Sequence, residues 1–194
     1  AMSDGEKLHT FVVYVDDLPG VLNRIASLFR RRAFNIESLT VGHTEMPGIS
    51  RMTIVSRINE GAAHRVEANI YKLINVLSVQ DVTLTSNVTR SLALIKVQAR
   101  EDSRHALMEI IRVFRARVVD LAPESLVIES TGAEERIQAL VEILRPFGIL
   151  EMARTGRLAM TRGAERSARE SLSPDAAEQP RKSSEQAVGV SHSV

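Results

Sequence analysis

The sequence contains no cysteine and no tryptophan, and these absences remove several classes of function. Without cysteine, a disulfide framework, a thiolate metal site and a thiol nucleophile are all excluded. Only two tyrosines and five phenylalanines are present, whereas an RNA-binding sheet needs aromatic side chains on neighbouring strands to stack against bases. The 25 basic and 24 acidic residues nearly cancel, so no charge excess indicates a polyanionic partner. The composition therefore disfavours a nucleic-acid-binding module.

Long hydrophobic runs are also missing. No apolar run approaches the roughly 18 residues that a membrane-spanning helix requires, and the first residues lack a basic segment followed by a long apolar stretch. We therefore expect a cytoplasmic protein with no membrane partner. The 194 residues are 44% hydrophobic, which is enough for packed cores in one domain or two small ones.

The common sequence signatures of catalysis are absent as well. The chain contains no G-x-S-x-G, no G-x-x-x-x-G-K-[ST], no G-x-G-x-x-G and no H-E-x-x-H. The histidines show no metal-ligand spacing, and we expect each to have a surface or edge role. They are His9, His43, His64, His105 and His192. We predict neither a catalytic residue nor a metal site.

What the sequence does contain is an alternation of strand-like and helix-like segments. β-Branched and aromatic runs predict strands, and apolar residues three or four apart predict helices. The first series is a strand at 8–15, a helix at 18–32, a hairpin of strands at 35–44 and 50–58, a helix at 61–74 and a strand at 76–84. This order is β-α-β-β-α-β.

The two helices of this series have apolar stripes that predict which residues are buried. In the first helix the stripe is Val21, Leu22, Ile25, Ala26, Leu28 and Phe29. Pro19 is expected in its first turn, where a missing N–H is tolerated. In the second helix the stripe is Val66, Ile70, Leu73 and Ile74.

The same order of elements then repeats. Strands are predicted at 91–99, 116–123, 125–131 and 148–153, with helices at 103–114 and 133–145. A shift of 71 positions aligns Gly61 with Gly132 and Arg65 with Arg136. We interpret the two series as copies of one supersecondary unit.

Each copy is expected to form a four-stranded antiparallel sheet with two helices on one face, because crossover connections are right-handed. The fold class is therefore α+β, with two tandem ferredoxin-like βαββαβ domains at 8–86 and 90–162. Residues 163–194 contain few large apolar side chains and are expected to form a disordered tail. One face of each sheet would lack a helical cover, so we expect a homodimer.

The stretch "DDLPGVL", at 16–22, is a candidate binding site. If the helix begins at Pro19, the N–H groups of Gly20, Val21 and Leu22 are among its unpaired donors and can receive an anion. Gly20 has no side chain to keep that anion at a distance. The alternative is a turn at the start of a helix, with no ligand.

Neighbouring residues would complete a site for a small aliphatic α-amino acid. The Asp17 carboxylate can accept from an ammonium group, and Asn35 brings an amide that both donates and accepts. Val21, Leu22 and Ile36 can form an aliphatic wall. A carboxylate receptor, an ammonium acceptor and an apolar wall together match such a ligand.

The segment "DDLPGVLNRIASLFRRRAFNIESLTVGHTEMPGISRMTIV", Asp16–Val55, resembles the opening of the small, regulatory subunit of acetolactate synthase (acetohydroxyacid synthase). The P-G-V-L helix start, "LFRRRAFNIESLTVG" and "SRMTIV" are its most specific parts, and the similarity continues in outline to Arg162. The resemblance implies an ACT-type amino-acid-binding domain over roughly the first 86 residues, followed by a second ferredoxin-like domain.

The resemblance also implies a role. Such subunits are not catalysts; they activate a large subunit that uses thiamine diphosphate and confer feedback inhibition by valine, sometimes with leucine or isoleucine. Thiamine diphosphate, Mg and FAD are expected in that catalytic partner, and no cofactor is expected in this chain. The alternative is a free-standing ACT-type sensor of another enzyme, to be distinguished by whether a large thiamine-diphosphate enzyme co-purifies.

In this family the effector lies between two ACT domains of different chains. The resemblance places the strand-to-helix loop of one chain on one side and the start of the second strand of the other chain opposite. The residues implicated are Asp17, Leu18, Pro19, Gly20, Val21 and Leu22 in the loop, with Asn35 and Ile36 in the strand. Asp17 stands where many members carry asparagine, which bears on selectivity for the ligand's ammonium group.

Overall fold

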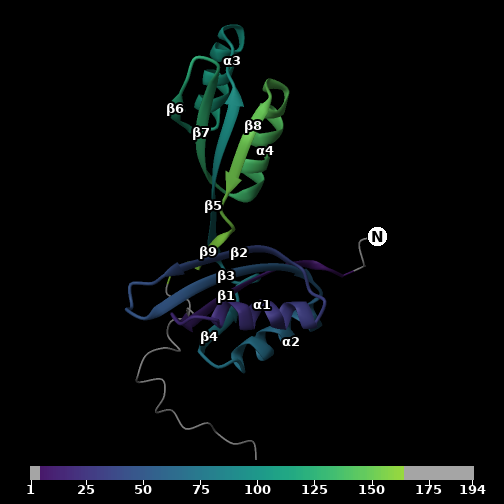
Figure 1. The fold of residues 1–194 in the computed structure, drawn as a ribbon. Helices are drawn as coiled ribbons and strands as arrows, with labels where there is room; N and C mark the ends of the chain where they lie inside the picture. The colour runs from purple at the N-terminus through teal and green to yellow at the C-terminus, as the bar shows by residue number, and fades with distance from the viewer. Residues whose placement is uncertain (1–4, 164–194) are drawn as a thin grey trace, which may run out of the picture.

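The computed structural model describes residues 5–163, which form two successive β-α-β-β-α-β units (Figure 1). The predicted α+β class and the tandem ferredoxin-like arrangement are confirmed. The first unit consists of β1 (Lys7–Asp16), α1 (Val21–Arg31), β2 (Ile36–His43), β3 (Ile49–Ile58), α2 (Glu60–Tyr71) and β4 (Val76–Asp81). The residues expected to form a tail lie outside the described residues, except for Gly163.

The first sheet is antiparallel in the order β2-β3-β1-β4. Alternate side chains of each strand point to one face, and both helices cover that face, on the side away from the second unit (Figure 1). The core lies between sheet and helices, with Phe11, Ile54 and Phe29 each at most 1% exposed. Burying one such side chain stabilises the fold by about 1.5–3 kcal/mol.

Two of the predicted helix positions are wrong. Leu22 is 41% exposed and Ile74 is 76% exposed, although both were expected in apolar stripes. Leu22 lies at the edge of the face that α1 buries. Ile74 lies beyond the end of α2, because the helix stops at Tyr71 and Asn75 takes a left-handed conformation with φ 72° that turns the chain into β4.

The second unit repeats this plan with an aliphatic core. Its elements are β5 (Asn87–Gln98), α3 (Glu101–Val113), β6 (Arg117–Leu121), β7 (Ser125–Gly132), α4 (Glu134–Leu144), the short 3-10 helix η1 (Arg145–Phe147) and β8 (Ile149–Arg154). The sheet order is β6-β7-β5-β8. Ile95, Leu107, Ile128 and Leu140 are fully buried between the sheet and its helices.

An additional strand, β9 (Leu158–Thr161), was not predicted. It pairs with the first residues of β5, from Asn87↔Thr161 to Arg90↔Leu158. Four residues with no clear alternation give no strand signal of their own, so only the pairing with β5 defines this element. The pair lies at the level of the first unit, beside its sheet (Figure 1).

The face of the first sheet that lacks helices is partly covered by this strand. Ala159 of β9 packs with Val12 and Val82, and Tyr14 lies against the same small cluster. Arg51 of β3 donates a hydrogen bond to the Ala159 carbonyl and lies over the Tyr14 ring, 5.8 Å from its centre. The uncovered face predicted from the sequence is therefore partly occupied by the chain's own C-terminal strand.

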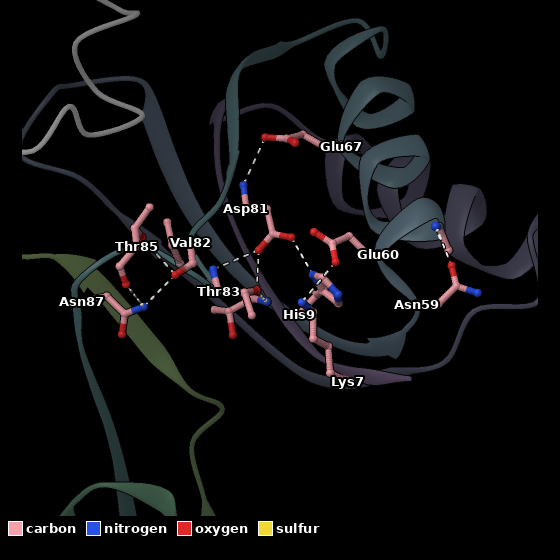
Figure 2. A network of polar contacts seen from close by, with 12 residues as sticks. Lys7, His9, Asn59, Glu60, Glu67, Asp81, Val82, Thr83, Thr85 and Asn87 are labelled. Atoms are coloured by element: carbon pink, nitrogen blue, oxygen red, sulfur yellow. Dashed lines mark hydrogen bonds and ion pairs between the residues drawn. The ribbon is translucent and has the colours of Figure 1, made fainter. Parts of the chain in front are cut away.

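A polar network fixes the connection between the units (Figure 2). His9 is 2% exposed, and its Nδ1 lies 2.6 Å from Asp81 Oδ2. The Thr83 N–H donates to Asp81 Oδ1 at 3.0 Å, and Thr83 Oγ1 accepts from the Thr10 N–H at 2.9 Å. The expected surface role of His9 is wrong, because the partner that makes its burial tolerable lies 72 residues away in the sequence.

No helix within residues 5–163 is long and apolar enough to cross a bilayer. The same range contains no group of three or more histidine, aspartate or glutamate side chains that could hold a metal ion.

Candidate functional site

Backbone hydrogen bonds set the path of the loop between β1 and α1. The Asp17 N–H donates to the Gly48 carbonyl at 2.8 Å, which attaches the loop to the β2–β3 hairpin turn. The Leu18 N–H donates to the Asp16 carbonyl at 2.9 Å. Gly20 then takes the left-handed conformation, with φ 86°, and serves as the N-cap of α1. Only glycine adopts this conformation without strain.

The helix therefore begins later than predicted. Pro19 was expected in its first turn, but α1 starts at Val21 and Pro19 lies in the loop before the cap. The left-handed Gly20 is the physical reason, because its backbone angles interrupt the helical path that would have included Pro19. The later start of α1 changes which N–H groups are left without a partner.

The start of α1 has no side-chain cap. Within the described chain the N–H groups of Gly20, Leu22 and Asn23 make no hydrogen bond, and that of Val21 makes only a long one of 3.4 Å to the Leu18 carbonyl. By contrast, α2 is capped by Asn59, whose Oδ1 accepts from the Ala62 N–H at 2.8 Å. Of the three predicted donors, Gly20 and Leu22 have no partner and Val21 has a long one, while Asn23 is a free donor that was not predicted.

The electrostatics of this helix end favour an anion. The first turn of α1 contains no acidic residue, and Arg30 and Arg31 lie in its last turn. The N-terminal end of a helix carries a partial positive charge, which an acid in the first turn would offset. No described atom lies within 4 Å of where a Cβ would stand on Gly20, so the space beside the free donors is open.

Asp17 stands beside this helix end with partners of its own. Its Oδ1 accepts from Ser50 Oγ at 3.1 Å, and its Oδ2 lies 3.2 Å from His43 Nδ1. The carboxylate side chain is still 45% exposed. Sequence reasoning did not associate His43 with this loop, because the association depends on the register of the β2–β3 hairpin, which pairs His43 with Ser50.

Of the aliphatic residues around Gly20, two are exposed and one is buried. Leu18 and Leu22 are 56% and 41% exposed and lie on either side of Gly20 in the sequence. Val21 is 2% exposed and belongs to the unit's own core. Of the predicted wall residues in the loop, Leu22 is therefore the one whose side chain is free to contact a ligand.

Asn35 and Ile36 lie at the other end of the same sheet. Ile36 pairs with Ser56, which in turn pairs with His9, whereas the loop follows Asp16. At about 3.4 Å per residue, the seven residues from His9 to Asp16 span about 24 Å. One chain therefore does not bring the two predicted parts of the site together.

A second copy of the chain offers a way to join them, because β2 is an edge strand of the first sheet. Antiparallel pairing of two β2 edges about a two-fold axis sets the start of one β2 beside the end of the other. The end of β2 is His43, which already lies against Asp17. Such a pairing would place Asn35 and Ile36 of one copy near the loop of the other.

Comparison with known families identifies both units. The family described as AHAS small subunit-like ACT domain matches residues 11–78. The family described as small subunit of acetolactate synthase matches residues 90–163.

The matches with individual relatives extend over nearly the whole length of those relatives. The acetolactate synthase small subunit of Mycolicibacterium smegmatis is 46% identical over 162 residues, which are 84% of this chain and 95% of the relative. The probable acetolactate synthase small subunit of Archaeoglobus fulgidus is 47% identical over 155 residues, 80% of this chain and 97% of the relative.

A solved structure agrees. The crystal structure of the acetolactate synthase small subunit from Thermotoga maritima is 35% identical and superposes with a TM-score of 0.76, covering 81% of this chain and 98% of that one. The chain belongs to the family of acetolactate synthase small subunits, which are regulatory and non-catalytic.

Proposed function

We propose that this chain binds valine between the first units of two copies and makes acetolactate synthesis by a large catalytic subunit sensitive to that end product. The observation that carries the proposal is the start of α1, which is uncapped, free of acids and open above Gly20. A carboxylate there gains hydrogen bonds from backbone N–H groups and the favourable end of the helix dipole.

The side chain and the ammonium group of valine also find suitable neighbours beside this helix end. The exposed side chains of Leu18 and Leu22 suit an isopropyl group. Asp17 suits the ammonium group, with His43 and Ser50 holding its carboxylate in place. The amide of Asn35 and the side chain of Ile36 from the second copy would close the site.

The expected affinity is moderate. Burying an isopropyl-sized group contributes about 1.5–3 kcal/mol, and a hydrogen bond to a charged group contributes about 1.5–3 kcal/mol. After the cost of association, these gains correspond to a dissociation constant between roughly micromolar and millimolar. A site in this range responds to changes in a metabolite pool.

The site links ligand binding to dimer geometry. Because each site takes residues from two chains, the ligand stabilises one arrangement of the pair. The chemistry itself belongs to the large subunit, and we propose that thiamine diphosphate, Mg and FAD are bound there. The small-subunit dimer would act on it as an allosteric effector, with a coupling of about 1–3 kcal/mol.

The test is reconstitution with the large subunit. Acetolactate formation is measured with and without valine, leucine and isoleucine, for the wild-type chain and for Gly20→Asp. We expect valine to inhibit the wild-type holoenzyme and the variant to be insensitive, because its carboxylate would stand beside the free N–H groups.

A matched control separates this charge effect from backbone strain. Gly163 also has a left-handed conformation, with φ 62° and open space around it, so Gly163→Asp adds the same group in the same geometry away from the site. We expect Gly163→Asp to remain sensitive to valine. Full valine inhibition of the Gly20→Asp holoenzyme would contradict the proposed pocket.

A further inference from the structure

The segment between β8 and β9 crosses the first sheet and makes unusually close backbone contact with β2. The Arg157 N–H donates to Ser38 Oγ at 2.9 Å, and Thr40 Oγ1 donates to the Arg157 carbonyl at 3.4 Å. A Cβ on Gly156 would stand 2.5 Å from Ser38 Oγ and 3.1 Å from the Leu39 carbonyl carbon. Only glycine permits this approach.

The side chain of Arg157 joins the two units. Its Nη2 lies 2.6 Å from Glu134 Oε2 in the second unit, and its Nη1 donates to Thr10 Oγ1 of β1 at 3.4 Å. The Arg157 side chain is only 16% exposed. A charge that is mostly buried is tolerated when it is paired, so its position depends on Glu134. Glu134 is the first residue of α4.

Besides Arg157, the junction is held by the polar network around Asp81 and Thr83 and by the bond from Arg51 to the Ala159 carbonyl, and it has little apolar contact. Its apolar contact is the small cluster of Val12, Val82 and Ala159. Beside Arg157 lies a cavity of about 370 Å³, lined in part by Glu37, Ser91, Glu134 and Arg154 from both units. Units joined by small, polar contacts change their relative position readily unless specific bonds hold them.

The β2 strand connects this junction to the proposed effector site. Ser38 and Thr40, which hold the segment, follow Asn35 and Ile36 on the same strand. A displacement at the start of β2 therefore reaches Arg157 through two hydrogen bonds, and from there reaches the start of α4.

We propose that Arg157 is a positioning residue that couples the effector site on β2 to the second unit. This inference rests on the proposed function, because it takes the start of β2 to be an effector contact. The effector favours one position of β2, and the Arg157–Glu134 pair holds the second unit in the matching orientation. Without the pair, the effector binds but its signal does not reach the second unit.

The experiment uses the holoenzyme reconstituted with the large subunit. Valine binding is measured by calorimetry on the small-subunit dimer, and inhibition is measured as the ratio of rates without and with saturating valine. For Arg157→Gln we expect a dissociation constant within about twofold of the wild type, and an inhibition ratio at least about fivefold smaller, the lower end of an allosteric coupling.

Two further variants separate coupling from folding. Arg154→Gln removes a cation that lines the same cavity without bridging to the first unit, and we expect it to behave as the wild type. The exchange Arg157→Glu with Glu134→Arg restores the ion pair in reverse, and we expect it to recover part of the inhibition that Arg157→Glu alone loses.

The outcomes distinguish the two proposals. A wild-type holoenzyme that valine does not inhibit overturns the proposed function and this inference with it. A wild-type enzyme that is inhibited, with Arg157→Gln inhibited equally, overturns only the inference. Loss of both valine binding and inhibition in Arg157→Gln also overturns it, because the residue would then serve the site or the fold rather than the coupling.

Discussion

The two units share one topology but differ at the start of their first helices. In the first unit, Gly20 is left-handed and α1 begins with no acid in its first turn. In the second unit, Arg100 is extended and α3 begins with Glu101 and Asp102. Neither helix has a side-chain cap. Both ends thus have free N–H groups, but only α3 has acids in its first turn.

This difference explains why we assign an effector site to one unit only. Acids in the first turn of α3 offset the positive end of the helix and repel a carboxylate ligand. The acid-free turn of α1 leaves that potential available. On the proposed function, two units of equal fold would differ in function, and a few residues at a helix end would determine which unit binds the effector.

The sheets of the two units also differ in what covers the face opposite the helices. In the first unit the segment that ends in β9 occupies part of that face. In the second unit the same face carries an exposed ion pair between Arg117 and Glu129, and the hydrogen bond and charge of Glu129 raise the pKa of the Arg117 guanidinium. Contacts between the units are thus made by the first sheet.

The largest expected effect tests whether the two cores are independent. Phe11 and Leu140 are both fully buried, one in each core. Phe11→Ala is expected to cost about 3–5 kcal/mol and Leu140→Ala about 2–5 kcal/mol, because each leaves a cavity. Native-state hydrogen exchange measures the loss unit by unit. We expect each variant to lower the protection of its own unit most.

Equal loss of protection in both units, for either variant, would contradict the expectation that the two cores are independent. It would show that the small junction makes the units unfold together. Asn59→Ala, which removes only a helix cap in the first unit, shows how much protection a mild local change removes in the same measurement.

The next prediction concerns an acid added to the first turn of α1, with the same change in α3 as its control. Asn23 and Ser103 are each the third residue of their helix, α1 and α3. Asn23→Asp adds an acid where α1 has none, so we expect valine binding to weaken about tenfold, or 1.4 kcal/mol. The same change should raise the stability of the first unit by about 0.3–1 kcal/mol. Calorimetry and chemical denaturation measure the two effects.

Ser103→Asp is the control, since it adds the same charge at the same position of the other unit. We expect it to leave valine binding unchanged. Equal weakening by both variants would mean that net charge, rather than the local field at α1, determines the affinity.

The smallest effect concerns the capped helix of the first unit. Asn59→Ala removes the acceptor of the Ala62 N–H and should cost about 1 kcal/mol of stability, the usual value of an N-cap. Because α2 does not form part of the proposed site, valine inhibition of the holoenzyme should not change. A loss of valine sensitivity in a folded Asn59→Ala protein would indicate that the site extends to α2.

The sequence predicted most of the architecture because its signals are local. Strand and helix periodicities and the turn at 45–49 are visible within short windows, and the repeat follows from comparing the order of the elements read in those windows. Gly20 and the absence of an acid from the first turn of α1 are also local sequence features. These local signals were sufficient for the fold, and they supply one half of the proposed site.

Three features that sequence reasoning missed depend on distant pairings. His43 reaches Asp17 only through the hairpin register, His9 is buried because Asp81 is its partner, and β9 exists because it pairs with β5. Residues far apart in the sequence supply these constraints, so no local window contains them. The exact start of α1 was missed for a local reason, since the left-handed Gly20 and not Pro19 determines it.

The most direct test of the proposed valine site is a crystal structure of the small-subunit dimer grown with valine. We expect the valine carboxylate within about 2.7–3.2 Å of the N atoms of Gly20, Leu22 or Asn23, with Asn35 of the second copy on the other side of the ligand. Valine bound elsewhere, with those N–H groups hydrogen-bonded to protein groups, would contradict it.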